Sequence, residues 1–306
     1  MLERAILIVS LLMTAIAAMA ADSHVLILRE EGPIARQTAE FLMADLARQG
    51  AVGRSIRQFE IGDQESASVV MRGLRVGEDA VVVAIGPRAL RPALQVAGGR
   101  PVLAILVSLA VLEDFGPGAD RIRAIVLDQP MPRLLNLVQA ALPSARRLGV
   151  LAGPASMVSL RILVRHAQDR GLTVAADVMT TSGEVVAALE RLVPRMELLL
   201  ALPDPLVHNR NTVQPLLLTT YRADIPVVTY SESYLHAGAA VALFSTPKQV
   251  ALQAAEAILQ YPEKGLPLPI QTPRYFTVGV NTAVVRSLGL SLPTAAELQE
   301  RLGSLE

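Results

Sequence analysis

The sequence contains neither cysteine nor tryptophan. Without cysteine the chain has no disulfide, no thiolate metal ligand, no thiol nucleophile and no lipidated N-terminal cysteine. Aromatic residues make up only 3% of its 306 residues, whereas sugar sites typically stack the sugar ring on aromatic faces. A carbohydrate site is therefore not expected.

Blocks of like charge are also missing. The 28 Lys and Arg residues balance the 28 Asp and Glu residues, and only Lys248 and Lys264 are lysines. Such a balance favours neither nucleic acid nor an anionic membrane surface as a partner. A hydrophobic content of 52% with 18% charged residues indicates a globular protein with a large core.

Motifs that would indicate an enzyme are absent as well. No GxGxxG follows a predicted strand, no Walker A lysine is present, and no G-x-S-x-G elbow occurs. The histidines at positions 24, 166, 208 and 236 show no HExxH spacing. We therefore expect no enzymatic activity, no metal and no cofactor. His208 either faces a site or is a solvated loop histidine.

The first 20 residues have the pattern of a secretory signal peptide. Arg4 supplies a positive charge, Ala5 to Ala17 form an apolar run, and Ala18–Met19–Ala20 resembles a cleavage site. The alternative is a membrane anchor, but the run is shorter than the ~20 residues that span a bilayer. We predict cleavage after Ala20 and export to the periplasm.

From residue 25 onward, short apolar runs alternate with segments of helical length. The predicted strands are 25–28, 55–61, 80–85, 101–107, 122–127, 148–151, 174–179, 198–202, 227–230, 240–244 and 275–280. The predicted helices are 33–49, 64–74, 88–96, 132–142, 157–168, 182–192, 211–222, 247–260 and 282–288. This alternation predicts right-handed βαβ units and parallel sheets, an α/β fold.

Two interruptions suggest two lobes. One is an irregular passage near residues 113–131, and the other is a proline-rich connector over 265–273. We assign 21–128 plus 245–272 to lobe 1, and 129–244 plus 273–306 to lobe 2. Ser182 is predicted to cap its helix. The side chains expected to face inward are Ile34, Phe41, Leu42 and Leu46 on one helix, and Val185, Val186, Leu189 and Leu192 on another.

Polar or glycine residues follow six of the predicted strands. Helix N-termini there offer free N–H groups, and ligands of open α/β sheets bind beyond the carboxyl ends of the strands. Because the six ends should converge on one edge, we predict a ligand site there. Its candidate residues are Asp204, Gly86, Pro87, Ser108, Gly153, Ser156, Tyr230 and Ser231. The alternative is that Ser156, Ser182 and Asp204 are ordinary N-caps.

Three passages resemble the ABC transporter substrate-binding family of tryptophan/tyrosine-type periplasmic binding proteins. They are Leu142–Pro154, Leu202–Val207 and Phe276–Gly289, the last followed by Pro293. The resemblance extends over residues 79–293. Gly86–Pro87 resembles a strand-end turn of the family, with Gly86 in place of a threonine, and Ser108–Leu109–Ala110 stands where the family has Asp-Pro.

The resemblance implies two Rossmann-like lobes of the periplasmic binding protein type I-like fold, closing on a small ligand. It also implies a periplasmic solute-binding protein of an ABC-type uptake system, which delivers an amino acid-like molecule to a membrane permease. Asp204 would contact the ligand, as the partner of an ammonium group. We expect a monomer. The alternative is a binding-protein-like accessory or sensor of an envelope receptor.

Overall fold

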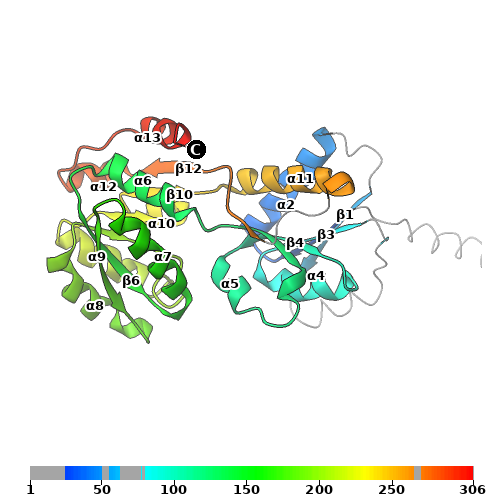
Figure 1. Ribbon diagram of the computed structural model, residues 1–306, viewed down its shortest axis with the longest axis horizontal. Coiled ribbons are helices and arrows are strands. Elements are labelled where there is room, and N and C mark those ends of the chain that lie inside the picture. Colours follow the sequence, from blue (N-terminus) through cyan, green and yellow to red (C-terminus); the bar gives the residue numbers. More distant parts are fainter. Residues whose placement is uncertain (1–24, 50–54, 63–76, 78–79, 265–269, 306) are drawn as a thin grey trace, which may run out of the picture. The chain divides into compact units, whose positions relative to one another are not determined.

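The computed structural model describes residues 25–49, 55–62, 77, 80–264 and 270–305. The predicted signal peptide and the helix predicted over 64–74 lie outside these residues. The chain forms two compact units, and each is described by itself below (Figure 1). Unit 1 takes its described residues from Met1–Val107, Phe115–Val126 and Pro247–Gln271, and unit 2 from Ser108–Asp114, Leu127–Thr246 and Thr272–Glu306.

Unit 1 contains a six-stranded parallel sheet in the order β11-β5-β4-β3-β1-β2. The central strands are apolar runs because both faces of a parallel sheet are covered. All five residues of β3 are buried, for example. The strands are β1 (Val25–Glu30), β2 (Ile56–Ile61), β3 (Val81–Ile85), β4 (Val102–Val107), β5 (Ile122–Val126) and β11 (Ile270–Gln271).

Helices α2 (Pro33–Arg48) and α11 (Pro247–Lys264) pack against each other in unit 1 and complete its core (Figure 1). The side of α2 that is buried carries Ala35, Ala39, Leu42 and Leu46. The two alanines on this side allow the two helices to approach closely. The predicted inward face is partly wrong, because Leu42 and Leu46 are buried but Ile34 is not. Ile34 is 60% exposed. The remaining helical segments of the unit are η1 (Pro87–Ala89), α4 (Leu90–Val96) and η2 (Ala119–Arg121).

Unit 2 contains the second six-stranded sheet, in the order β12-β10-β9-β8-β6-β7. Its strands are β6 (Arg147–Ala152), β7 (Thr173–Val178), β8 (Leu198–Leu200), β9 (Val227–Thr229), β10 (Val241–Phe244) and β12 (Thr277–Val280). Only β12 departs from the predicted parallel arrangement. It starts beside the end of β10, where Thr277 pairs with Phe244, and therefore runs back along it.

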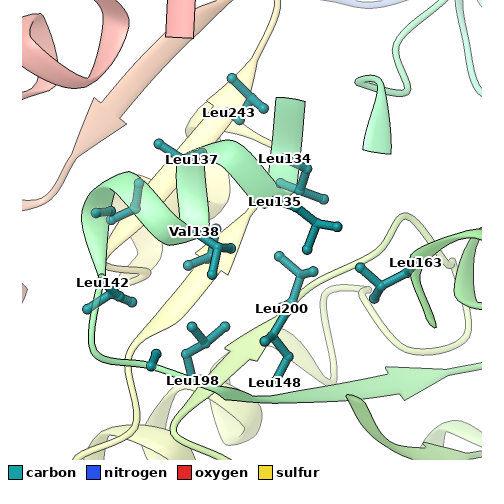
Figure 2. Packing of buried hydrophobic residues seen from close by; sticks show 14 of the residues in the cluster. Leu134, Leu135, Leu137, Val138, Leu142, Leu148, Leu163, Leu198, Leu200 and Leu243 are labelled. Atoms are coloured by element: carbon teal, nitrogen blue, oxygen red, sulfur yellow. The ribbon is translucent and has the colours of Figure 1, made fainter. Parts of the chain in front are cut away.

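Helices cover both faces of the second sheet. On one face, Leu134, Leu135 and Val138 of α6 (Met131–Ala141) pack in one cluster with Leu148 of β6 and Leu198 of β8 (Figure 2). On the other face lie α8 (Val185–Leu192) and α9 (Val213–Arg222). The other helical segments of the unit are α5 (Leu109–Glu113), η3 (Pro154–Ser156), α7 (Met157–Gln168), η4 (Ser182–Glu184), η5 (Val193–Arg195), α10 (Glu232–Ala237), α12 (Thr282–Ser287) and α13 (Ala295–Gly303).

The cap and the inward face predicted near residue 182 need correction. Thr181 is the N-cap, in a capping box with Glu184, and Ser182 is the first residue of η4. The capping box satisfies backbone N–H groups from both directions, which favours Thr181. Val186 is 41% exposed, and Ala188 takes its place on the buried face.

Segments near the boundaries between the units are tied together inside unit 2. Gln129 donates through Nε2 to Ser245 Oγ at 3.0 Å, and Ser245 Oγ donates to the carbonyl of Tyr275 at 2.7 Å. The buried Arg133 donates to Gln129 Oε1 at 2.7 Å and to the carbonyl of Pro273 at 2.8 Å. These bonds join three segments of unit 2, residues 129–133, 245 and 273–275. Within the described part of the chain, no helix is both long enough and apolar enough to cross a bilayer.

Candidate functional site

Both sheets reverse their direction of growth at one point. In unit 1, β2 lies on one side of β1 and β3 on the other; in unit 2, β7 and β8 flank β6 in the same way. Ligands of open α/β sheets bind outside the carboxyl ends of the strands at such switch points. The predicted site residues follow β3 and β4 in the first sheet and β6, β8 and β9 in the second. These strands lie at the two switch points or next to them.

Asp204 is the centre of the hydrogen-bond network at the switch point of unit 2. The residue follows β8 and is only 2% exposed. Its Oδ2 accepts hydrogen bonds from the backbone N–H groups of Gly153 and Ser156, each at 3.0 Å, and from Ser156 Oγ at 2.8 Å. Its Oδ1 accepts from the N–H of Leu206 at 2.9 Å. The carboxylate therefore joins the turn after β6 to the turn after β8.

This network needs a glycine at position 153. A Cβ there would lie 2.8 Å from both carboxylate oxygens of Asp204. The structure thus brings together three predicted site residues, Asp204, Gly153 and Ser156, but their polar groups face one another. Asp204 is predicted either to contact the ligand or to cap the helix that follows it. Three of its four hydrogen bonds instead cap the turn after β6, and α9 begins only at Val213. The ligand contact of Asp204 stays a prediction.

Three rings form a cluster beside this network. The His208 ring lies edge-on to Tyr230 and Tyr234, with ring centroids 5.8 and 5.5 Å away, and the two tyrosine rings are stacked at 6.5 Å. His208 Nδ1 is 3.3 Å from the Tyr234 hydroxyl. His208 Nε2 is buried and has no hydrogen-bond partner among the described residues. His208 is therefore not a solvated loop residue.

Burial shifts the pKa of all three side chains. It lowers the pKa of His208 from 6.5 to about 4, although the charge of Asp204 acts in the opposite direction. Burial also raises the pKa of Tyr230 to about 12, helped by the charges of Asp204 and Asp128. The pKa of Tyr234 is raised mainly by burial. At neutral pH the cluster is uncharged and offers aromatic surface with neutral polar groups.

Two of the three predicted serines, Ser108 and Ser231, act as helix caps. Ser231 Oγ accepts from the N–H of Tyr234 at 3.2 Å at the start of α10. Ser108 Oγ accepts from the N–H of Val111 at 3.4 Å at the start of α5. Asp128 accepts from the N–H of Leu109 at 2.8 Å, and burial raises its pKa. Ser231 directly follows Tyr230 of the ring cluster, whereas no hydrogen bond joins Ser108 to that cluster.

The switch point of unit 1 is formed by Glu30, at the end of β1, and the turn Gly86–Pro87 after β3. Gly86 is buried with φ +89°, and Pro87 is exposed. Glu30 is half-buried and accepts from the N–H of Arg88 through Oε2 at 3.2 Å. Gly86 donates its N–H to the carbonyl of Ile105 at 2.9 Å, which anchors the turn on β4.

The candidate residues therefore belong to two sheet edges and not to one. Gly86 and Pro87 follow β3 and Ser108 follows β4, both strands of the sheet in unit 1, although Ser108 itself is grouped with unit 2. The other five follow strands of the sheet in unit 2. Three further residues lie at these edges but are not among the predicted site residues: Glu30, His208 and Tyr234. Glu30 and His208 were visible as strand-end residues, while Tyr234 lies on the short helix α10, which has too few turns for a periodic pattern. Among the described residues, no group of three or more acidic, histidine or cysteine side chains is placed to hold a metal ion.

Comparison with known proteins identifies the relatives of this chain. A family model described as "ABC transporter substrate binding protein" matches residues 53–296. No curated protein sequence matches the chain.

Several solved structures share the fold. A structure from Streptococcus pneumonia of the ABC domain in complex with L-Trp has a TM-score of 0.63 at 14% identity, covering 92% of this chain and 98% of that one. A ligand-free, open substrate-binding protein with adhesive properties from Clostridium difficile has a TM-score of 0.67 at 19% identity, covering 88% and 96%. A periplasmic ribose ABC transporter protein from Conexibacter woesei has a TM-score of 0.60 at 14% identity, covering 91% and 98%. These likenesses confirm the predicted type I-like α/β fold.

Proposed function

Because the chain belongs to the ABC transporter substrate-binding protein family, we propose that it is a periplasmic solute-binding protein for a small, amino acid-like molecule. In this proposal it passes the molecule to the membrane permease of an ABC-type uptake system. The observation that carries the proposal is the placement of half-buried polar residues at the carboxyl edges of the two sheets: Glu30 at the switch point of unit 1, and Tyr230 after β9 in unit 2.

An amino acid suits these two edges better than a sugar does. Glu30 offers a carboxylate, and the half-buried rings of Tyr230 and His208 offer an aromatic surface that is uncharged at neutral pH. One similar structure was solved with L-Trp, a ligand that combines an ammonium group with an aromatic ring. That both units contact the ligand in a cleft between them stays a prediction from the sequence.

Mass spectrometry of small molecules released from the purified periplasmic protein tests the ligand class. We expect an amino acid-like compound, and adding it back should raise the melting temperature of the stripped protein. If neither the released compounds nor any of the twenty L-amino acids stabilises the protein, the proposal is wrong. Uptake of the compound by cells with and without the gene then separates a transport protein from an accessory or sensor, since only the former supports uptake.

A further inference from the structure

We propose that Glu30, and not Asp204, is the carboxylate that binds the ammonium group of the ligand. The inference rests on the proposed function and adds the residue that selects a ligand with a positively charged nitrogen. It follows from a difference between two carboxylates that occupy similar places in their sheets. Each lies over the glycine of a Gly-Pro turn at a switch point.

The Glu30 side chain lies directly over Gly86. A Cβ on residue 86 would be 2.2 Å from Glu30 Cδ and 2.6 Å from both Cγ and Oε1. Glycine at this position therefore makes room for the carboxylate, and it also allows the φ of +89° that the turn requires. The hydrogen bond that the carboxylate accepts from the N–H of Arg88 holds it at the edge of the sheet.

The two carboxylates differ in how much of their hydrogen-bonding capacity is used. An ionised carboxylate has about four lone-pair sites. Asp204 accepts four hydrogen bonds and is 2% exposed. Glu30 accepts one hydrogen bond from the described residues and is half-buried. Glu30 thus keeps acceptor capacity that the described residues do not use, whereas Asp204 is enclosed and already accepts four hydrogen bonds.

The charges around Glu30 favour a positively charged partner. The nearest basic side chain along the strand, Arg29, is buried and forms an ion pair with Glu60. Glu31 follows Glu30 and is exposed, with its carboxylate beside Gly62. Among the described residues, Glu30 itself forms no ion pair, so its charge is not balanced by a basic side chain bound to it. A primary ammonium group, with three N–H donors and a positive charge, fits such an edge.

The test compares Glu30→Gln with Glu31→Gln, which removes the same charge from the next residue. Glutamine keeps an oxygen that can accept the N–H of Arg88, so we expect both variants to melt as wild type does. The twenty L-amino acids are first screened for binding to wild type by thermal shift. Calorimetric titration then measures the tightest one, and also its analogue in which hydrogen replaces the ammonium group, against all three proteins.

We expect Glu30→Gln to weaken binding of the amino acid roughly 10- to 150-fold, the range for a hydrogen bond to a charged group. Glu31→Gln should change it by no more than about twofold, as for a screened surface charge. The analogue should bind wild type weakly and lose nothing further in Glu30→Gln, because the contact is already gone.

Three results would overturn the inference. Equal affinities of Glu30→Gln and Glu31→Gln would remove the role of Glu30. An equal loss for the analogue would show that Glu30 does not act on the ammonium group. If wild type itself binds no amino acid, the proposed ligand class is wrong, and the inference is rejected with it. The last failure is seen in wild type and the first two only in the variants, so the two proposals are tested separately.

Discussion

Units 1 and 2 use the same pair of groups, a carboxylate and a Gly-Pro turn, with the strands exchanged. In unit 1 the carboxylate of Glu30 ends the first strand, β1, and the turn at Gly86 follows β3. In unit 2 the turn at Gly153 follows the first strand, β6, and the carboxylate of Asp204 follows β8. One pair is buried and fully hydrogen-bonded, and the other is half-open. The comparison teaches that a carboxylate at a switch point can serve either the fold or a ligand.

The largest expected effect is the loss of stability in Asp204→Ala. The change removes the acceptor of four hydrogen bonds, at about 1.5–3 kcal/mol for each bond to a charged group. The N–H groups of Gly153 and Ser156 and the Ser156 hydroxyl keep only the bonds of 3.1–3.2 Å within their own turn. Because these losses overlap, we expect the free energy of unfolding to fall by about 3–5 kcal/mol. Glu30→Ala should change it by no more than about 0.5 kcal/mol. Urea unfolding followed by circular dichroism measures both, and equal losses would contradict the distinction between the two carboxylates.

The second largest expected effect is a loss of stability on acidification. His208 has a pKa of about 4 in the folded protein and 6.5 when exposed, so on acidification the unfolded chain takes up the proton first. Stability should therefore fall as pH drops from 6.5 to 4, by about 3 kcal/mol in total. Asp128, whose pKa is raised, acts in the opposite sense. The difference in the free energy of unfolding between wild type and His208→Asn, measured at each pH, isolates the contribution of the histidine.

Tyrosine fluorescence is a suitable readout for this acid effect. The chain has no tryptophan, and four of its five tyrosines (Tyr221, Tyr230, Tyr234 and Tyr275) lie in unit 2. His236→Asn is the matched control, because His236 is exposed on α10. The assignment of the acid effect to His208 would be contradicted if the free energy of unfolding depended on pH in His208→Asn as in wild type. It would also be contradicted if this dependence disappeared in His236→Asn.

The third effect is smaller and sharpens the comparison of the two turns. Gly153 has a φ of −122°, which suits any residue, so Gly153→Ala destabilises only through the clash with Asp204, by about 2 kcal/mol. Gly86→Ala costs about 1–2 kcal/mol because its φ is positive, while the Glu30 side chain can turn away. In urea unfolding, the first loss should vanish in the Asp204→Ala background. The second should persist unchanged with Glu30→Ala, and the reverse pattern would contradict this explanation.

Much of the fold was predictable because buried parallel strands are uninterrupted apolar runs. Val81–Ile85 and Leu198–Leu200 lie within the predicted strands, and α7 covers the predicted 157–168. The five- and six-residue helices α5 and α10 were missed because they are too short to show a helical period. The antiparallel direction of β12 was also missed, since it depends on where the chain re-enters the sheet.

The positions of the site residues at the strand ends were predictable, but the hydrogen-bond partners of these residues were not. The turns near Gly86, Gly153 and Asp204 follow from strands that end in glycine or proline. Which groups meet there depends on contacts far apart in sequence. Asp204 accepts from a residue 51 positions away, and Glu30 from one 58 positions away. No local sequence pattern distinguishes a carboxylate whose oxygens already accept several hydrogen bonds from one whose oxygens can still accept them from a ligand.

The discontinuity of unit 1 has a consequence for how the protein is made. Helix α11 supplies Val250, Ala251, Ala254, Ala255 and Ile258 to the core of unit 1, all nearly inaccessible to solvent. In the order of synthesis it follows the whole stretch 127–246 of unit 2. A nascent chain that ends before Pro247 therefore exposes the apolar side of α2, and domains whose cores remain open in this way are prone to aggregate. Unit 2 in turn still lacks β12, α12 and α13 at that moment, so neither unit can complete its core until the part of the chain after residue 246 has been made.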